Sequence, residues 1–146
     1  MSDFFSGSRH GIDVIAHRGG KGEAPEETLV AFANAKQLGV DVLEMDIRVT
    51  SDGELVLIFE VIRFVVSSRW GTGDYRPNVA AIETSSKSID RRLVETAKKH
   101  GLKLHAFTVN EVDDMKRLIA LGVDGIITDF PTRLLELLSS RTPSSS

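Results

Sequence analysis

The sequence predicts an α/β fold built on parallel strands, and two observations support this. A strand–helix–strand pattern occurs near each end of the chain, over 14–47 and over 102–128, and this alternation is typical of parallel strands joined by right-handed crossovers. The tetrapeptide Leu-Gly-Val-Asp also occurs twice, at 38–41 and at 121–124, each time between a predicted helix and a predicted strand. One repeated unit fits either a barrel or a doubly wound sheet.

Apolar periodicity and terminating residues predict the individual elements. The first helix is expected to carry Leu29, Phe32 and Ala33 on one face. Asn110 is expected to cap a later helix, and Pro131 to occupy the first turn of the last one. The predicted order is strand 14–16, helix 28–39, strand 40–47, turn 51–53, strand 55–59, strand 61–66, loop 67–78, a helix from Ser88 or Asp90 to 100, strand 102–109, helix 110–122, strand 125–128 and helix 131–138.

Composition narrows the class of protein. With 146 residues, 41% hydrophobic and 27% charged, the chain is typical of one globular domain, expected over 13–138 between an N-terminal segment (1–12) and a disordered tail (139–146). The net charge of −3 argues against a nucleic-acid partner. No apolar run approaches the roughly 20 residues of a transmembrane segment, and the N-terminus lacks the apolar core of a signal peptide, so a cytoplasmic location is expected. The absence of cysteine excludes disulfides and thiolate metal sites.

Two carboxylates in the strand predicted at 40–47 are candidate metal ligands. Glu44 and Asp46 are two residues apart, so in a strand their side chains share one face. In a buried parallel strand such a pair loses hydration and repels, which a hard cation with oxygen ligands would relieve. The alternative is a solvated strand face, and spacing alone does not decide between the two.

The end of the first strand carries the other candidates. His17 and Arg18 follow the apolar run 14–16, where an imidazole can transfer a proton and a guanidinium can hold an anionic oxygen. A histidine–arginine pair alone is more often structural. The combination with Glu44 and Asp46 favours a site, because parallel α/β folds place their sites at the carboxyl ends of neighbouring strands.

The motifs resemble a known family, that of the glycerophosphodiester phosphodiesterases. Members of that family carry H-R-G, P-E-N-T, E-x-D, T-x-D-G, H-G-L and T-D-x-P in this order. The matching stretches here are IAHRG (15–19), APEETL (24–29), GVD (39–41), EMD (44–46), TSDG (50–53), LV (55–56), HGLK (100–103), FTVN (107–110) and GVDGIITDFP (122–131).

The resemblance implies a (β/α)8 barrel of the TIM type that hydrolyses glycerophosphodiesters to glycerol 3-phosphate and an alcohol, a step in lipid and glycerol metabolism, with a divalent cation, Mg²⁺ or Ca²⁺. By position, His17 resembles one of two catalytic histidines, Arg18 a phosphate-binding residue, and Glu44 and Asp46 metal ligands. Such barrels run to about 250 residues, so this chain is expected to be a shortened, incomplete barrel that lacks central units.

Two positions depart from the family pattern. Phe59 and Glu60 stand where the family has His-Asp, and a phenylalanine cannot replace the second histidine as a proton carrier. The third metal-binding glutamate has no clear counterpart, and Glu60 and Glu83 are the candidates for it. Three hypotheses follow: an enzyme of reduced activity, a phosphate- and metal-binding remnant without turnover, and a homodimer that completes the barrel, which is compatible with either of the others.

Overall fold

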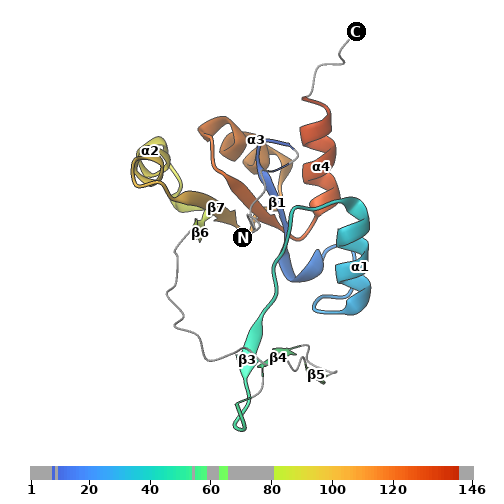
Figure 1. The fold of residues 1–146 in the computed structure, drawn as a ribbon. Helices are drawn as coiled ribbons and strands as arrows, with labels where there is room; N and C mark the ends of the chain where they lie inside the picture. Colours follow the sequence, from blue (N-terminus) through green and yellow to red (C-terminus); the bar gives the residue numbers. More distant parts are fainter. Residues whose placement is uncertain (1–7, 9, 54, 59–62, 66–80, 142–146) are drawn as a thin grey trace.

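A computed structural model describes residues 8, 10–53, 55–58, 63–65 and 81–141 (Figure 1). The strands are β1 (Asp13–Ala16), β2 (Val42–Leu43), β3 (Ile47–Val49), β4 (Leu55–Ile58), β5 (Arg63–Val65), β6 (Ala81–Ser85), β7 (Lys103–Phe107) and β8 (Gly125–Thr128). The helices are α1 (Leu29–Leu38), α2 (Arg91–Lys99), α3 (Val112–Leu121) and α4 (Pro131–Ser139), with 3-10 turns η1 (His17–Gly19) and η2 (Ser86–Ser88).

Five strands form one parallel sheet in the order β2-β1-β8-β7-β6. The first strand therefore pairs with the last one, with Ala16 opposite Thr128, which is the seam that closes a (β/α) barrel. The arc ends at β2 and at β6, which do not pair with each other. The predicted parallel α/β fold is confirmed, and its sheet is an open part of a barrel.

The helices α2, α3 and α4 pack on one face of this sheet and bury one core. Alternation along each strand sends every second residue towards them, so Val14, Leu104 and Ile126 meet Met115 of α3 and Leu134 of α4. All five side chains are fully buried. The other side chains of β1, β7 and β8 face what would be the barrel interior, and the strand ends carry the polar residues of the site. Within the described ranges, no helix is long and apolar enough to span a bilayer.

Local signals set both ends of α1 and the start of α2, as predicted. Thr28 Oγ1 accepts the Ala31 N–H at the start of α1, and Asp90 Oδ1 accepts the Leu93 N–H at the start of α2, which satisfies backbone donors that have no partner inside the helix. Gly39 ends α1 in the left-handed region with φ +82°, where glycine carries no steric cost.

The buried face of α1 differs from the prediction. Ala31 and Ala35 are buried, whereas Leu29 is 69% exposed and Ala33 is exposed. The reason is close packing against η1. A Cβ added at Gly19 would lie 2.8 Å from the Ala31 Cβ and 3.0 Å from the Phe32 ring, so the backbone of η1 lies close against α1 at Ala31, while Phe32 of the predicted face is partly buried.

The strand predicted at 40–47 is also wrong in its extent. Glu44, Met45 and Asp46 lie in neither β2 nor β3. The Glu44 N–H still donates to the Ala16 carbonyl at 3.1 Å, after which the chain leaves the parallel sheet. β3 then pairs antiparallel with β4, and β4 with β5, in a separate sheet. The turn predicted at 51–53 is confirmed, because it joins the antiparallel strands β3 and β4. β5 lies within the strand predicted at 61–66, and the loop predicted at 67–78 lies outside the described residues.

Candidate functional site

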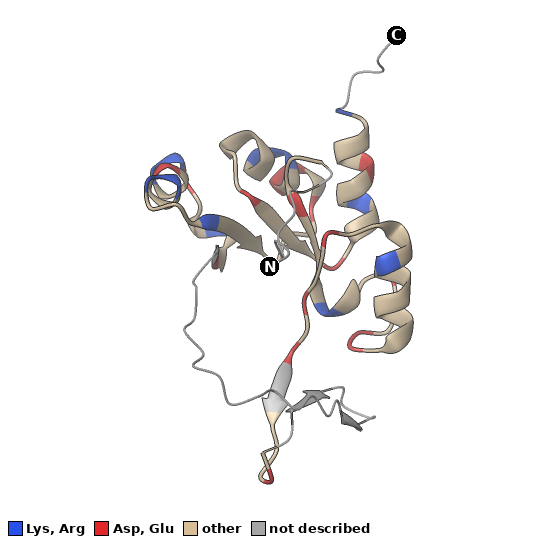
Figure 2. Ribbon diagram, in the orientation of Figure 1, with Lys and Arg blue, Asp and Glu red and all other residues tan. Residues whose placement is uncertain are grey.

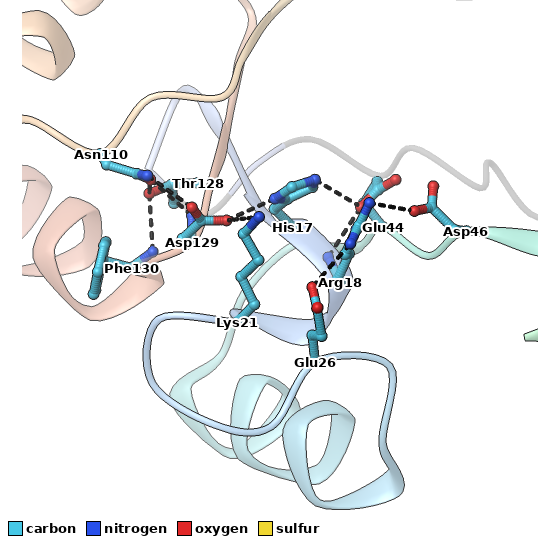
Figure 3. A network of polar contacts seen from close by, with 10 residues as sticks. All are labelled: His17, Arg18, Lys21, Glu26, Glu44, Asp46, Asn110, Thr128, Asp129 and Phe130. Carbon is cyan, nitrogen blue, oxygen red and sulfur yellow. Dashed lines mark hydrogen bonds and ion pairs between the residues drawn. The ribbon is translucent and has the colours of Figure 1, made fainter. Parts of the chain in front are cut away.

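The site residues stand at the carboxyl edge of the parallel sheet. His17 follows β1, Glu44 follows β2, and Asp129 follows β8, so three adjacent strands deliver polar side chains to one place. Figure 3 shows these side chains in a chain of contacts from Asn110 to Asp46. This is the edge at which parallel α/β folds hold their ligands.

His17 is partly buried between two carboxylates. Its Nδ1 lies 2.6 Å from Asp129 Oδ1, and its Nε2 lies 3.9 Å from Glu44 Oε2. The first distance is that of a short hydrogen bond, whereas the second is too long for one. The imidazole is therefore anchored at Nδ1, and its Nε2 remains directed towards Glu44.

Arg18 contacts both predicted metal ligands, Glu44 and Asp46. Its guanidinium lies 3.0 Å from Glu26 and 2.8 Å from Asp46, and its main-chain N–H donates to Glu44 Oε2 at 2.9 Å. The hydrogen bond to Glu26 raises the pKa of Arg18 above its ordinary value, and the Asp46 charge adds to this effect while burial opposes it. Arg18 itself has φ +50°, an uncommon conformation for a residue with a side chain.

Four carboxylates lie close to Arg18, two of them in contact with its guanidinium. Glu26, Glu27, Glu44 and Asp46 all come from the two segments beside Arg18, and Figure 2 shows acidic residues along the segment that leads to β3. Glu27 is only 4% exposed. Its Oε1 accepts the Asp46 N–H at 2.9 Å, and its buried Oε2 has no hydrogen-bond partner within the described part of the chain. Burial, and then the charges of Asp46 and Glu44, raise the pKa of Glu27 although that hydrogen bond opposes the shift.

This excess of negative charge fits a cation. Carboxylate oxygens are the ligands of Mg²⁺ and Ca²⁺, and Mg²⁺ is commonly held by one or two carboxylates together with substrate phosphate and water. Among the described residues, no three His, Cys, Asp or Glu side chains are already arranged around one ion position. The arrangement thus offers two accessible carboxylates, Glu44 and Asp46, rather than a complete protein cage.

A pocket of about 160 Å³ opens beside His17. It is lined by His17, Glu44, Glu83, Phe107, Thr108 and Ile127. Glu83 reaches it from β6, where it stands opposite His105 of β7 in the strand register. Of the two candidates for a third carboxylate, Glu83 is thereby brought to the site, whereas Glu60 lies outside the described residues, as does Phe59.

The structure brings together the four residues singled out in the sequence, His17, Arg18, Glu44 and Asp46, although the last two are not on a strand as predicted. The neighbourhood that the motifs implied is therefore present, while the reason given for it, a shared strand face, is wrong. Arg18 joins the two carboxylates instead, one through its main chain and one through its side chain.

Sequence reasoning missed the partners of His17. Asp129 bonds the imidazole, and Asn110 bonds Asp129. Asn110 was predicted to cap α3, but Glu111 occupies the N-cap position and no side chain caps that helix. The available signal was that both Asp46 and Asp129 follow apolar strands, which in a parallel sheet places them at one edge.

Comparison with known proteins identifies the family and the fold of the chain. The family model "Glycerophosphoryl diester phosphodiesterase family" matches residues 17–66 and 68–133. A glycerophosphodiester phosphodiesterase of Caldanaerobacter subterraneus is 25% identical over 235 positions, which cover 86% of this chain and 97% of that protein. Since this chain has 146 residues, that alignment contains long gaps.

Other relatives match one segment closely. Human glycerophosphodiester phosphodiesterase 1 is 48% identical over 52 residues, which are 36% of this chain and 16% of that protein, so this chain spans about a sixth of its length. The crystal structure of a glycerophosphodiester phosphodiesterase from Agrobacterium tumefaciens is similar with a TM-score of 0.68 at 16% identity, over 88% of this chain and 99% of that one. The fold is thus that of a TIM-type barrel with its sheet left open, and the chain belongs to the glycerophosphoryl diester phosphodiesterase family as a shortened member.

Proposed function

We propose that this chain binds a divalent cation and a phosphodiester at the carboxyl edge of its sheet, and hydrolyses glycerophosphodiesters to glycerol 3-phosphate and an alcohol. One observation carries the proposal. A histidine, an arginine and two carboxylates from distant segments, His17, Arg18, Glu44 and Asp46, lie within one connected set of contacts (Figure 3). Family membership supports the substrate class.

Arg18 is proposed to hold the phosphate. A guanidinium can donate two parallel hydrogen bonds to phosphate oxygens. Its side chain is about a third exposed, so a ligand can reach it, and the cost of withdrawing it from the carboxylates is moderate because exposed ion pairs are weak. Phosphate binding would therefore exchange the Asp46 partner of Arg18 for a phosphate oxygen.

His17 is proposed to move a proton at its Nε2. In the hydrolysis a water oxygen bonds to phosphorus while the bond from phosphorus to the departing alcohol oxygen breaks. One proton leaves the water and one joins the departing oxygen. His17 Nε2, which lines the pocket with Glu44, can serve one of these transfers, and a positioned acid or base of this kind contributes about 10²–10⁴-fold to a rate.

Glu44 and Asp46 are proposed to hold the cation, with Glu83, which lines the pocket together with Glu44, as a further carboxylate. When bound, Mg²⁺ or Ca²⁺ supplies charge neutralisation at the phosphate oxygens and lowers the pKa of a bound hydroxyl. The Oε2 of Glu27, which has no hydrogen-bond partner among the described residues, supports a cation here, because a buried carboxylate beside two others is costly unless positive charge or a proton compensates it.

An inactive binding module is the alternative function. Phe59 stands where family members have their second histidine, so one of the two proton transfers lacks a side chain of the usual kind. In that case the same residues would bind the cation and a phosphate without turnover. Phe59→His is the informative variant, because it restores a proton carrier at that position.

Assembly of two copies is a further proposal. Within the described residues, β2 and β6 each have one partner strand in the parallel sheet, and an unpaired strand edge is a template for pairing with another chain. Light scattering at micromolar concentration that yields twice the 16.0 kDa mass of one chain would support a dimer. If light scattering instead yields the mass of a single chain, a dimer does not complete the barrel.

Hydrolysis of glycerophosphocholine, followed by release of glycerol 3-phosphate, tests the proposed function. We expect Mg²⁺- or Ca²⁺-dependent turnover that His17→Ala and Glu44→Ala abolish and that Phe59→His increases. Turnover that persists in both alanine variants would contradict the assigned roles. No turnover in any variant, together with cation binding, would support the inactive binding module.

A further inference from the structure

The pairing of β1 with β8 places Asp129 beside His17. Ala16 and Thr128 are partners in the parallel register of β1 and β8, so the residue that follows each of them leaves its strand at the same level. Asp129 is 8% exposed, and its Oδ1 lies 2.6 Å from His17 Nδ1. The contact joins residues 112 positions apart, across the seam between β1 and β8.

Asn110 holds the Asp129 carboxylate from the other side. Its Nδ2 donates to Asp129 Oδ2 at 2.7 Å, and its Oδ1 accepts the Asp129 main-chain N–H at 3.0 Å. The main chain of Asp129 is also tied to the opposite side, since its carbonyl accepts the Gly22 N–H at 2.9 Å. Each carboxylate oxygen therefore has a separate partner, and the carboxylate plane is fixed (Figure 3).

We propose that Asp129, held by Asn110, is the positioning residue of His17. A carboxylate without a proton is only an acceptor, so the neutral imidazole must carry its hydrogen on Nδ1 and keep a lone pair on Nε2. That is the tautomer in which the nitrogen facing the pocket can take a proton. This inference rests on the proposed function, in which His17 is the proton carrier.

Lys21 offers a different explanation for Asp129, because its Nζ lies 3.9 Å from the same Oδ1. That distance is too long for a hydrogen bond, and the lysine side chain is 36% exposed. A half-exposed ion pair of this kind stabilises little, whereas the 2.6 Å contact to a partly buried imidazole is a strong hydrogen bond. The distances therefore assign Asp129 to His17 rather than to Lys21.

Histidine ring ¹⁵N–¹H correlation spectra test the tautomer directly. The chain has four histidines, and His17→Gln identifies the signals of His17. In alkaline buffer, where imidazoles are neutral, we expect His17 to be protonated on Nδ1 in the unaltered chain and to shift towards the Nε2-protonated form in Asp129→Asn. A proton on Nε2 in the unaltered chain, or tautomer populations that do not change in Asp129→Asn, would overturn the proposal.

Two further variants separate positioning from folding. Asn110→Ala leaves both Asp129 and His17 in place and is expected to give a mixture of tautomers. Asp124→Asn is the matched control, because Asp124 flanks the other end of β8 and accepts the Leu104 N–H at 3.0 Å. It must leave the His17 spectrum unchanged, and a spectrum that shifts equally in the control would show a general structural effect and overturn the proposal.

The kinetic test uses the split between kcat and KM. Asp129→Asn is expected to lower kcat by about 10²–10⁴-fold, the range that loss of a correctly presented base gives, with little change in KM because Arg18 is untouched. Asp129→Glu is expected to restore part of the loss. A rise in KM with unchanged kcat would contradict a positioning role. If the chain shows the Nδ1 tautomer but no turnover, the proposed hydrolysis is refuted, whereas the positioning of the His17 ring by Asp129 is supported.

Discussion

The guanidinium of Arg18 lies 2.8 Å from the carboxylate of Asp46, so the residue proposed to hold the phosphate is paired with a residue proposed to hold the cation. The same arginine binds Glu44 through its main-chain N–H. Binding of the phosphate and binding of the cation should therefore both change the contacts of Arg18 with Asp46 and Glu44. A cation at Glu44 and Asp46 would free the Arg18 side chain from Asp46 while Glu26 still binds it, and a phosphate on Arg18 would release Asp46.

Cation binding is expected to stabilise the fold through Glu44. A ligand that binds only the folded state stabilises it by about 2.7 kcal/mol at a concentration of about 100 times its Kd. Thermal unfolding with and without Mg²⁺ or Ca²⁺ should show this rise, and Glu44→Gln should remove it, because an amide is a poorer ligand than a carboxylate. Asp113→Asn is the control, since Asp113 is 98% exposed on α3. A rise of equal size in both variants would place the cation elsewhere.

His105 should make stability depend on pH. It is 4% exposed in β7, and burial lowers its pKa below the ordinary value of 6.5. The charges of Asp13, Glu83 and Asp124 oppose this shift, and Lys103 adds to it. Below about pH 6.5 His105 binds a proton in the unfolded chain but not in the folded chain, because its pKa is lower when it is buried. The contribution of neutral His105 to the free energy of unfolding should therefore be at its full value above that pH, and it should decrease as the pH falls towards the lowered pKa.

Urea unfolding at several pH values measures this effect. His105→Gln should flatten the decrease below about pH 6.5, because it removes the titrating group from the core. His100→Gln is the matched histidine control, since His100 is exposed at the end of α2 and should leave the profile unchanged. An unaltered profile in His105→Gln would assign the pH dependence to other groups.

Gly125 in β8 is expected to be essential for packing. A Cβ at this position would lie 2.7 Å from the His105 ring, so Gly125→Ala should cost about 1–3 kcal/mol of unfolding free energy, the usual cost of overpacking a core. The double variant with His105→Ala tests the reason. If the ring is the obstacle, the two changes should together cost clearly less than the sum of their separate effects, and simple additivity would mean that the strain lies elsewhere.

The helix ends could be predicted from sequence because their causes are local. Thr28 and Asp90 cap α1 and α2, and Pro131 opens α4, each within a few residues of the helix that it starts. The parallel order also followed from the alternation of strands and helices. These elements place His17 at the carboxyl edge of the sheet, as expected.

The remaining differences arise from contacts between distant segments. Asn110 has the residue type of a helix cap, but Asp129 provides two partners for its side chain, and no local pattern reveals that competition. Glu44 and Asp46 leave the predicted strand because their segment is bound by Arg18, which follows β1, and by Glu27, which precedes α1. Neither effect can be read from residue periodicity.

Calorimetric titration with glycerol 3-phosphate, in the presence and absence of Mg²⁺, tests most directly the claim that cation and phosphate share the Arg18–Asp46 contact. We predict tighter phosphate binding with Mg²⁺, by about fivefold or more, the lower end of usual coupling between two ligands. Asp46→Asn should weaken that dependence on Mg²⁺, and Arg18→Ala should remove phosphate binding. Equal affinity with and without Mg²⁺, or unchanged binding in Arg18→Ala, would contradict the account.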